Sequence, residues 1–287
     1  VREDLKKKEE MIEKVTKRQE GVLDILVSIP QALISGGAGT GKTYLAVEKA
    51  RRLVKQGKKV LLTCFNRPLA EELERNYIYA GLTILNFHQF CWRQACQAGV
   101  LWHGSRDLPD PDGDTAHGMD SRYFDEFLPK ALTAATGMSV DRFDALIIDE
   151  GQDFNPAWIL TLRGTLRNQS SDVFYIFFDD NQNLWRKEAF APTGMPVIPL
   201  KDNLRNSRQV FESFEGLYDG LAMQSAGPDG GKVDFTRIDA SRPESIVGAL
   251  KTLIKRLTEQ EGLAPKSIAV LTGVSLRHSV LRDCSDL

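Results

Sequence analysis

One octapeptide of the chain fits the phosphate-binding loop pattern G-x-x-x-x-G-K-[ST]: Gly36-Gly37-Ala38-Gly39-Thr40-Gly41-Lys42-Thr43. The apolar run at residues 32–35 predicts a buried strand before it, and apolar residues at helical spacing over residues 44–54 predict a helix after it. Glycines let consecutive backbone N–H groups curl round a polyphosphate, and the helix N-terminus adds partial positive charge. We therefore expect Lys42 to reach the β- and γ-phosphates and the Thr43 hydroxyl to bind Mg²⁺. The competing interpretation is a Gly-rich turn that happens to carry a lysine.

Composition is typical of a globular protein with room for roughly two domains: of 287 residues, 42% are hydrophobic and 26% charged. No apolar run approaches the roughly 18 residues that span a membrane, and the charged first residues do not predict a signal peptide. The formal net charge is −2, so any nucleic-acid groove must be local. The four cysteines lack paired C-x-x-C spacing and indicate reduced thiols in a cytoplasmic protein: Cys64, Cys91, Cys96 and Cys284.

Strand and helix patterns alternate along the first part of the chain. Strands are predicted at residues 59–65, 82–87, 145–148 and 173–178. Helices are predicted at residues 68–77, from residue 88, and at residues 121–136. This alternation favours βαβ units, and hence an α/β fold with a parallel sheet flanked by helices.

The predicted domain organisation has three parts. Residues 1–18 are charge-dense and predict a solvated helix or linker, and residues 19–195 form a first domain around the phosphate-binding loop. Because a Pro-rich connection spans residues 191–199, we expect a partial second domain at residues 196–287.

Finer expectations concern the second domain and an insertion in the first. The second domain is expected to hold helices at residues 208–223 and 243–258 and strands at residues 233–238 and 267–271. Residues 92–144 are expected to form a reduced accessory insertion, a helix or two with a disordered acidic loop at residues 102–120.

Two acidic residues, Asp149 and Glu150, directly follow the apolar run at residues 145–148. An Asp at the end of a buried strand can hold Mg²⁺, directly or through water, and a neighbouring Glu can orient or deprotonate the attacking water. Alone the pair is a weak signal, because acidic residues often end strands. Together with the phosphate-binding loop, it predicts a nucleoside triphosphatase.

The spelling Asp149-Glu150-x-Gln152-Asp153 resembles the UvrD/Rep-like family of superfamily 1 DNA and RNA helicases, and the resemblance runs through most of the chain. Four other segments are similar to family motifs: Thr63-Cys64-Phe65-Asn66-Arg67, Asn86-Phe87-His88-Gln89-Phe90-Cys91, Asp179-Asp180-Asn181-Gln182-Asn183-Leu184-Trp185 and Leu200-Lys201-Asp202-Asn203-Leu204-Arg205. The resemblance implies two RecA-like domains with ATP and Mg²⁺ bound in the cleft between them.

The resemblance also implies roles for individual residues. It assigns catalysis and γ-phosphate sensing to Lys42, Glu150, Gln182 and Arg205, with Arg205 reaching the phosphate from the second domain. It assigns nucleotide binding to Gln19, which stands at the family's adenine-reading position, and to Gly37, Ala38, Gly39, Thr40, Gly41, Lys42 and Thr43. It assigns Mg²⁺ to Thr43 and Asp149, and single-stranded DNA or RNA to Phe65, Asn66, Arg67, His88 and Trp185.

Several of these residues keep a second interpretation. Phe65 and Trp185 either stack on bases or pack in the protein. His88 either touches the nucleic-acid backbone or caps a helix, and Arg205 is either an arginine finger or a surface charge. Trp158 is interpreted as a packing residue.

The chain departs from the family pattern in three places. Leu204 stands where the family has Tyr, which weakens stacking on adenine, and Phe178 replaces the usual Gly before Asp179. The family's last motifs, a Gly-x-Glu segment and V-A-x-T-R-A, are not found. We therefore expect a chain truncated in its second domain that binds ATP but hydrolyses it poorly. Its motif wording also resembles helicases joined to an upstream nuclease-related (NERD) domain, a possible partner.

The sequence thus predicts an ATP-dependent helicase or translocase motor on single-stranded nucleic acid. One alternative is a P-loop ATPase switch that acts on protein partners without nucleic acid. A second is a binding or scaffold protein with degenerate catalysis, but the intact Lys42, Thr43, Asp149 and Glu150 speak against it.

Overall fold

The chain divides into two compact units, Val1–Lys232 and Val233–Leu287, which we call unit 1 and unit 2. The computed structural model describes residues 20–100, 109–113, 119–138, 141–179, 181, 194–218, 220, 222–239, 241–275 and 278–282. No helix among these residues is long and apolar enough to cross a membrane.

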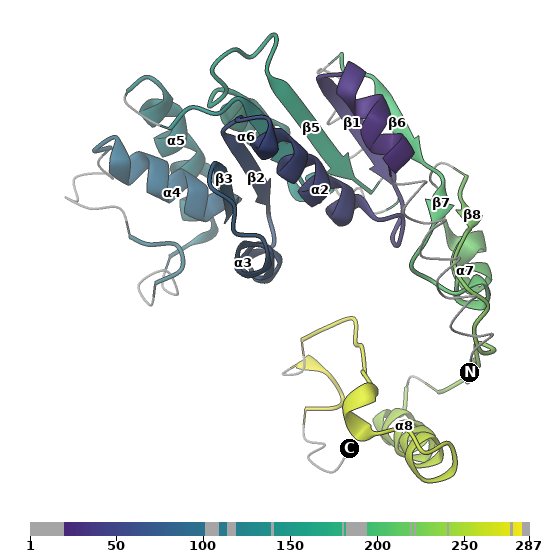
Figure 1. Ribbon diagram of the computed structural model, residues 1–287. Coiled ribbons are helices and arrows are strands. Elements are labelled where there is room, and N and C mark those ends of the chain that lie inside the picture. Colours follow the sequence, from purple (N-terminus) through teal and green to yellow (C-terminus); the bar gives the residue numbers. More distant parts are fainter. Residues whose placement is uncertain are drawn as a thin grey trace. The chain divides into compact units, whose positions relative to one another are not determined.

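Unit 1 is built on a six-stranded sheet whose paired strands are all parallel (Figure 1). Its order is β3-β2-β4-β5-β1-β6. The strands are β1 (Gln31–Gly36), β2 (Val60–Cys64), β3 (Leu82–Asn86), β4 (Ala145–Ile148), β5 (Val173–Phe178) and β6 (Val197–Leu200). β1, which leads into the phosphate-binding loop, and β4, which is followed by Asp149, lie on either side of β5. The predicted α/β fold with a RecA-like parallel sheet is confirmed.

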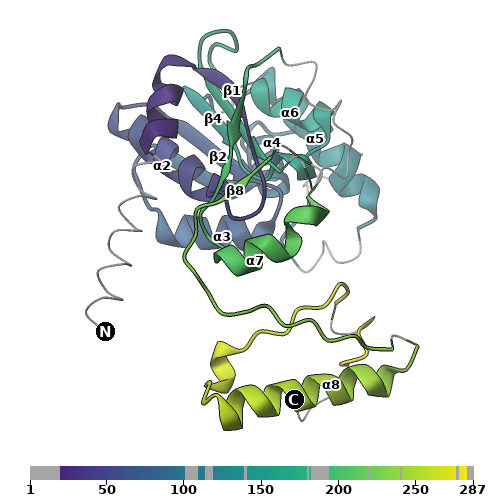
Figure 2. The same ribbon diagram turned by 90° about the vertical axis from the view of Figure 1, so that its right-hand side faces the viewer.

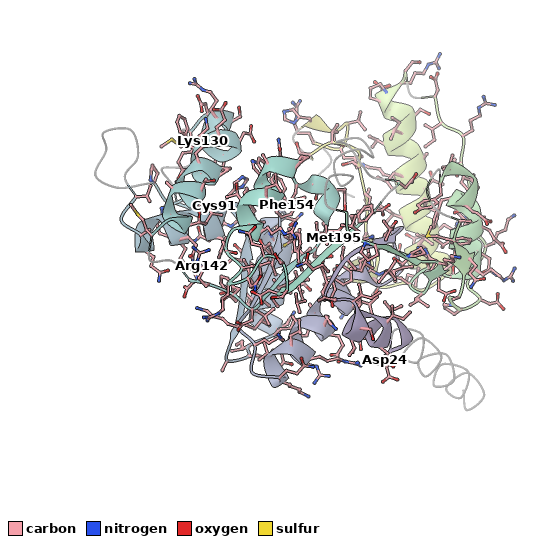
Figure 3. All side chains as sticks on the ribbon, turned by 90° about the horizontal axis from the view of Figure 1, so that it is seen from above. Asp24, Cys91, Lys130, Arg142, Phe154 and Met195 are labelled. Carbon is pink, nitrogen blue, oxygen red and sulfur yellow. The ribbon has the colours of Figure 1, made fainter. Side chains whose placement is uncertain are left out.

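Helices cover both faces of the sheet because successive strand residues point to opposite sides. Leu33, Leu61 and Leu146 pack in one core with α4 (Phe87–Gln97), α5 (Leu128–Thr136) and α6 (Pro156–Arg163). Their chain neighbours Ile34, Leu62 and Ile147 pack in the other core with helical residues 20–28, α2 (Lys42–Lys55) and α3 (Arg67–Asn76). Cys91 and Phe154, labelled in Figure 3, belong to the first core.

Asparagines begin the two helices that follow β2 and β3. The Asn66 side chain accepts a hydrogen bond from Leu69 N at 3.0 Å, and the Asn86 side chain accepts one from Gln89 N at 3.0 Å. Each satisfies an N–H group that the first helical turn leaves without a partner. These caps fix where Phe65, Arg67 and His88 leave the sheet.

The insertion between α4 and β4 is helical where the structure describes it. η2 (Tyr123–Phe127) leads into α5, which packs against α4. Residues 109–113 form a turn in which Gly113 N donates to Asp110 O at 3.0 Å. The Tyr123 hydroxyl donates to the Pro109 carbonyl and so ties this turn to η2.

The first sheet extends past the predicted boundary at residues 195–196. β6 pairs with β1 in parallel register, with Ile34 opposite Ile198. Residues 197–200 therefore belong to the first sheet. Their backbone groups are satisfied by pairing with β1, which the Pro-rich composition of this segment did not predict. The predicted helix at residues 208–223 is also shorter, since α7 (Arg208–Phe214) is followed by the single 3-10 turn η5 (Glu215–Leu217) and a two-residue pairing of β7 (Asp202–Asn203) with β8 (Gln224–Ser225).

Unit 2 contains α8 (Pro243–Lys255), which continues into η6 (Arg256–Gln260) and is followed by η7 (Pro265–Ser267) (Figure 2). The predicted helix at residues 243–258 is confirmed. The strands predicted at residues 233–238 and 267–271 are wrong, because these residues have no strand conformation. A β-strand needs a neighbour to satisfy its backbone, and no described residue of unit 2 provides one. That these residues form part of a second RecA-like domain stays a prediction.

Candidate nucleotide-binding site

Three neighbouring strands bring the predicted nucleotide-binding residues to one edge of the sheet. Because β4, β5 and β1 are parallel, the residues that follow them lie together at their carboxyl ends: Asp149, Asp179 and the phosphate-binding loop. Open α/β sheets bind their ligands at this edge.

The loop conformation requires its glycines. Gly39 and Gly41 have φ angles of 85° and 89°, a region that L-residues with side chains rarely adopt. A Cβ on Gly36 would lie 2.6 Å from the Thr40 hydroxyl, which donates to the Gly37 carbonyl at 2.8 Å. Helix α2 then begins at Lys42 with no side-chain cap and no acidic residue in its first turn. Its positive end is thus available to an anion.

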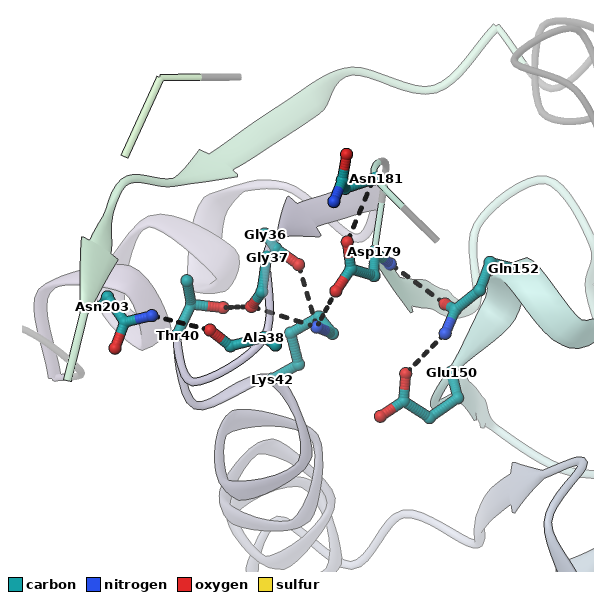
Figure 4. Close-up of polar contacts among 10 residues, drawn as sticks. All are labelled: Gly36, Gly37, Ala38, Thr40, Lys42, Glu150, Gln152, Asp179, Asn181 and Asn203. Atoms are coloured by element: carbon teal, nitrogen blue, oxygen red, sulfur yellow. Dashed lines mark hydrogen bonds and ion pairs between the residues drawn. The ribbon is translucent and has the colours of Figure 1, made fainter. Parts of the chain in front are cut away.

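Lys42 is buried at this helix start and bonds to the loop itself (Figure 4). Its Nζ donates to the carbonyl oxygens of Gly36 at 2.9 Å and Gly37 at 3.3 Å. It also lies 3.5 Å from Asp179 Oδ2, in a pair whose side chains are 7% and 1% exposed. The ammonium is therefore held by an aspartate that we did not single out from the sequence.

Asp149 is a buried carboxylate without a hydrogen-bond partner. Neither of its oxygens accepts a bond from any described residue. Burial, and secondarily the charge of Glu150, raises its pKa to about 7, although the nearby Thr43 hydroxyl and the Lys42 ammonium act in the opposite direction. A buried acceptor left without a partner costs about 1–3 kcal/mol, so the site favours a cation or a donor.

The Asp149 carboxylate and the Thr43 hydroxyl are suitable ligands for Mg²⁺. Among the described residues, no three His, Cys, Asp or Glu side chains gather as a metal site. Mg²⁺ nevertheless needs only one or two protein oxygens when phosphates and water supply the rest. The unpartnered oxygens of Asp149 therefore fit Mg²⁺ bound with a nucleotide.

Glu150 is held in a strained conformation. Its φ of 52° and ψ of 47° lie in the left-handed region, and it is the one non-glycine residue with positive φ in the described part of the chain. Such a conformation costs on the order of 1–3 kcal/mol. It places the Glu150 side chain in reach of Gln152, whose amide donates to Glu150 Oε2 at 2.7 Å and accepts from Asp179 N at 3.0 Å. Gln152 thus connects Glu150 to the aspartate that pairs with Lys42 (Figure 4).

Gly151 allows this turn to pack on β5. A Cβ at Gly151 would overlap the Cγ2 methyl of Ile176. The sequence analysis did not predict that Gln152 holds Glu150 or that Asp179 pairs with Lys42. Both residues stand within helicase-like motifs, and this was the signal that could have identified them.

Arg205, which was predicted to reach the phosphate from a second domain at residues 196–287, lies in the same compact unit as the phosphate-binding loop. Its backbone N–H donates to the Gly39 carbonyl at 3.1 Å, because β6 runs parallel to β1 and brings Leu200 opposite Gly36 at the start of the loop. Its side chain is exposed. Gln19, Gln182 and Trp185 lie outside the described residues, so their roles stay predictions.

A cavity of about 250 Å³ lies beside the loop residue Thr40. Aliphatic side chains form much of its wall: Val22, Leu45, Pro199, Leu200 and Leu204. Leu204 takes part in this wall although it lacks the aromatic ring expected from the helicase motif. The polar side chains of Thr40, Lys201, Asp202 and Gln224 complete the lining, so the cavity offers both apolar and polar contacts next to the phosphate-binding loop.

Four of the predicted nucleic-acid residues line a second hollow of about 340 Å³, namely Phe65, Asn66, Arg67 and His88. Phe65 is 38% exposed, and its ring is parallel to that of Trp158 with centroids 6.0 Å apart. Trp158 is buried, as predicted for a packing residue, and its ring packs against one face of the Phe65 ring. Arg67 pairs with Asp112 at 3.3 Å across the hollow.

His88 lies inside this hollow rather than at a helix cap. Asn86 caps α4, so the cap interpretation of His88 is wrong. Burial among Phe65, Phe124 and Trp158 lowers the His88 pKa to about 4. Its Nε2 is buried without a hydrogen-bond partner among the described residues. The ring is therefore neutral at pH 7.

A family model described as an AAA domain, AAA_19, matches residues 19–186, more than half of the chain. No curated protein matches the sequence. Among solved structures, the Pif1 helicase from Candida albicans is similar with 18% identity and a TM-score of 0.41, over 71% of this chain and 44% of that chain. AMPPCP-bound DnaA from Aquifex aeolicus is similar with 14% identity and a TM-score of 0.34, over 88% and 63%. Bacteroides sp Pif1 in complex with ADP-AlF4 is similar with 14% identity and a TM-score of 0.35, over 69% and 44%. The chain thus spans less than two thirds of each of these proteins.

Proposed function

Because the chain belongs to the AAA domain family AAA_19 and its motifs resemble those of superfamily 1 helicases, we propose that it is the ATP-hydrolysing part of a motor on single-stranded nucleic acid. The observation that carries this proposal is the unpartnered, fully buried Asp149 beside Thr43, at the same sheet edge as the phosphate-binding loop. A buried carboxylate without a partner lowers the stability of the fold, and a bound cation next to Asp149 would offset this cost.

The residues of the site divide the work of phosphoryl transfer. The loop N–H groups and Lys42 would bind the phosphates, while Thr43 and Asp149 would hold Mg²⁺, which neutralises charge on the phosphates when bound. Lys42 must give up its bonds to the Gly36 and Gly37 carbonyls to reach a phosphate. Glu150 would orient and deprotonate water, with Gln152 holding its carboxylate in place. Gln182 and Arg205 would sense the γ-phosphate.

The test of catalysis is the steady-state ATPase rate of the chain with Mg²⁺. We expect Glu150→Gln to bind ATP and to lower kcat roughly 10²–10⁴-fold, because it removes the general base. Glu72→Gln, the same change on the exposed face of α3, is the matched control and should behave as the parent. Equal rates in all three proteins would refute the role of Glu150.

Nucleic-acid binding is proposed at the hollow lined by Phe65, Arg67 and His88. An exposed aromatic ring beside a basic side chain is suited to stacking a base and neutralising a phosphate. Fluorescence anisotropy with single-stranded DNA and RNA oligonucleotides tests this. Phe65→Ala should weaken binding about 10-fold, since stacking is worth about 1–3 kcal/mol per base. Tyr79→Ala, which removes a ring of the same 38% exposure outside the hollow, should not.

The same measurements separate the motor from a switch that acts on proteins. Stimulation of the ATPase by DNA or RNA would support the motor. ATP hydrolysis without stimulation, together with unchanged binding in Phe65→Ala, would favour the protein switch.

A further inference from the structure

The segment after β6 is bound to the phosphate-binding loop through the carbonyl oxygens of that loop. The Asn203 side-chain amide donates to the Ala38 carbonyl at 2.7 Å (Figure 4). The backbone N–H groups of Leu204 and Arg205 donate to the Gly39 carbonyl at 2.9 and 3.1 Å. Two consecutive loop carbonyls are therefore held by one short segment, which we call the loop clamp (residues 203–205).

Asn203 is suited to a fixed position rather than to a mobile surface contact. It is 0% exposed, and its Oδ1 accepts from Asn206 N at 3.1 Å. Its backbone carbonyl accepts from Ala226 N at 2.9 Å, next to the pairing of β7 with β8. Gly39 has no room for a side chain, because a Cβ there would lie 2.9 Å from Asn203 Oδ1.

The geometry of the peptide unit gives this contact a function. In a planar trans peptide the C=O and the following N–H point in opposite directions. Holding the Ala38 carbonyl toward Asn203 therefore turns the Gly39 N–H to the other side of the loop. Backbone N–H groups fixed in this way form a concave site for an anion and cost no reorganisation when the anion binds.

We infer that Asn203 is a positioning residue, which prepares the loop for phosphate by fixing the Ala38–Gly39 peptide. The inference rests on the proposed nucleotide site and adds a residue to it that acts through the loop rather than on the nucleotide. It also links the loop to Arg205, since the Arg205 backbone N–H is one of the donors that hold the Gly39 carbonyl.

The test compares nucleotide affinity in matched variants, using a fluorescent ADP analogue with Mg²⁺. Asn203→Asp keeps the shape and replaces the donor by an oxygen that faces the Ala38 carbonyl, and Asn203→Ala removes the side chain without adding charge. Asn76→Asp adds the same charge at an exposed position in the last turn of α3, away from the loop. We expect both Asn203 variants to raise Kd at least about 10-fold, which corresponds to the loss of about one hydrogen bond, and Asn76→Asp to stay within about 3-fold of the parent.

Two further readouts separate positioning from plain folding stability. In steady-state ATPase assays KM should rise more than kcat falls, and the melting temperature without nucleotide should not predict the loss of affinity across the variants. Hydrogen exchange on the parent needs no variant, and there the amides of Leu204 and Arg205 should be protected before nucleotide is added.

Three results would overturn the inference: parent-like Kd in both Asn203 variants, an equal loss in Asn76→Asp, or rapid exchange at Leu204 and Arg205. A parent protein that binds no nucleotide would refute the proposed function itself, and the role of Asn203 with it. Nucleotide binding in the parent with no effect of Asn203 would refute only the loop clamp.

Discussion

Replacing Lys42 should lower the stability of the folded protein as well as remove a charge that binds phosphate. Lys42→Met leaves Asp179, which is 1% exposed, without the ammonium 3.5 Å away. It also removes the donor to the Gly36 and Gly37 carbonyls. At 3.5 Å and an effective dielectric constant of about 20, Coulomb's law gives an attraction of about 5 kcal/mol, an upper bound for the pair. Breaking one side of a buried ion pair costs about 3–5 kcal/mol.

We therefore expect Lys42→Met to lower the free energy of unfolding by about 3–5 kcal/mol. Asp179→Asn should cost less, about 1–3 kcal/mol, because the remaining ammonium keeps its two carbonyl partners. The double variant should lose less stability than the sum of the two single losses, with a coupling energy of about 2–3 kcal/mol, since it removes both charges together. Its ATPase activity should stay absent, because the phosphate-binding charge is still missing.

Urea denaturation of the four proteins measures the coupling, and a parallel ATPase assay measures the activity. Each unfolding curve should keep the same slope, so that midpoints report stability. A coupling energy below about 0.5 kcal/mol, the range of exposed pairs, would refute the buried pair. Recovery of ATPase in the double variant would refute the assignment of Lys42 to phosphate.

Three other predictions address the second hollow and the turn after β4. His88 binds a proton near pH 6.5 when unfolded but near pH 4 when folded, so the parent should lose up to about 3 kcal/mol of stability as the pH falls through this window; in His88→Phe the pH dependence of the urea midpoint should be shallower, and an unchanged pH dependence would contradict the buried neutral ring. Asp112→Asn should strengthen binding of a single-stranded oligonucleotide at low salt, because it removes an acid 3.3 Å from Arg67, whereas Asp24→Asn on the helix at residues 20–28 should not; anisotropy titrations decide, and equal affinity would show that Asp112 does not compete with phosphate. Gly151→Ala should lower the free energy of unfolding by about 1–3 kcal/mol, seen as a lower urea midpoint, and should also lower kcat, because the added Cβ overlaps Ile176. Stability and kcat equal to those of the parent would show that the turn can shift to make room for the methyl group.

Local patterns in the sequence were enough to predict the first domain's strands. Residues 145–148 and 173–178 are apolar without interruption, as buried parallel strands are. The helix predicted over residues 44–54 matches α2, and Gly57, which follows its C-cap residue Gln56, has a φ of 80° typical of a glycine that ends a helix. Each of these features depends on neighbouring residues, so the order of amino acids contains it.

Prediction from local patterns failed for strands whose existence depends on pairing with a distant segment. Residues 233–238 and 267–271 have strand-like composition, but no described neighbour pairs with them. Residues 197–200 were assigned to a second domain, yet β6 completes the first sheet beside β1. Pairing between strands is a property of segments far apart in the chain, and composition does not report it.

By itself the sequence determined the class of fold and the chemistry of the loop, because glycine spacing, a terminal Lys-Thr and apolar strands act over a few residues. Only the tertiary structure decided which groups meet: Lys42 with Asp179, Gln152 with Asp179, and Asn203 with Ala38. Those pairs lie up to 165 residues apart, and the order of parallel strands, rather than any local preference, brings their side chains to one edge.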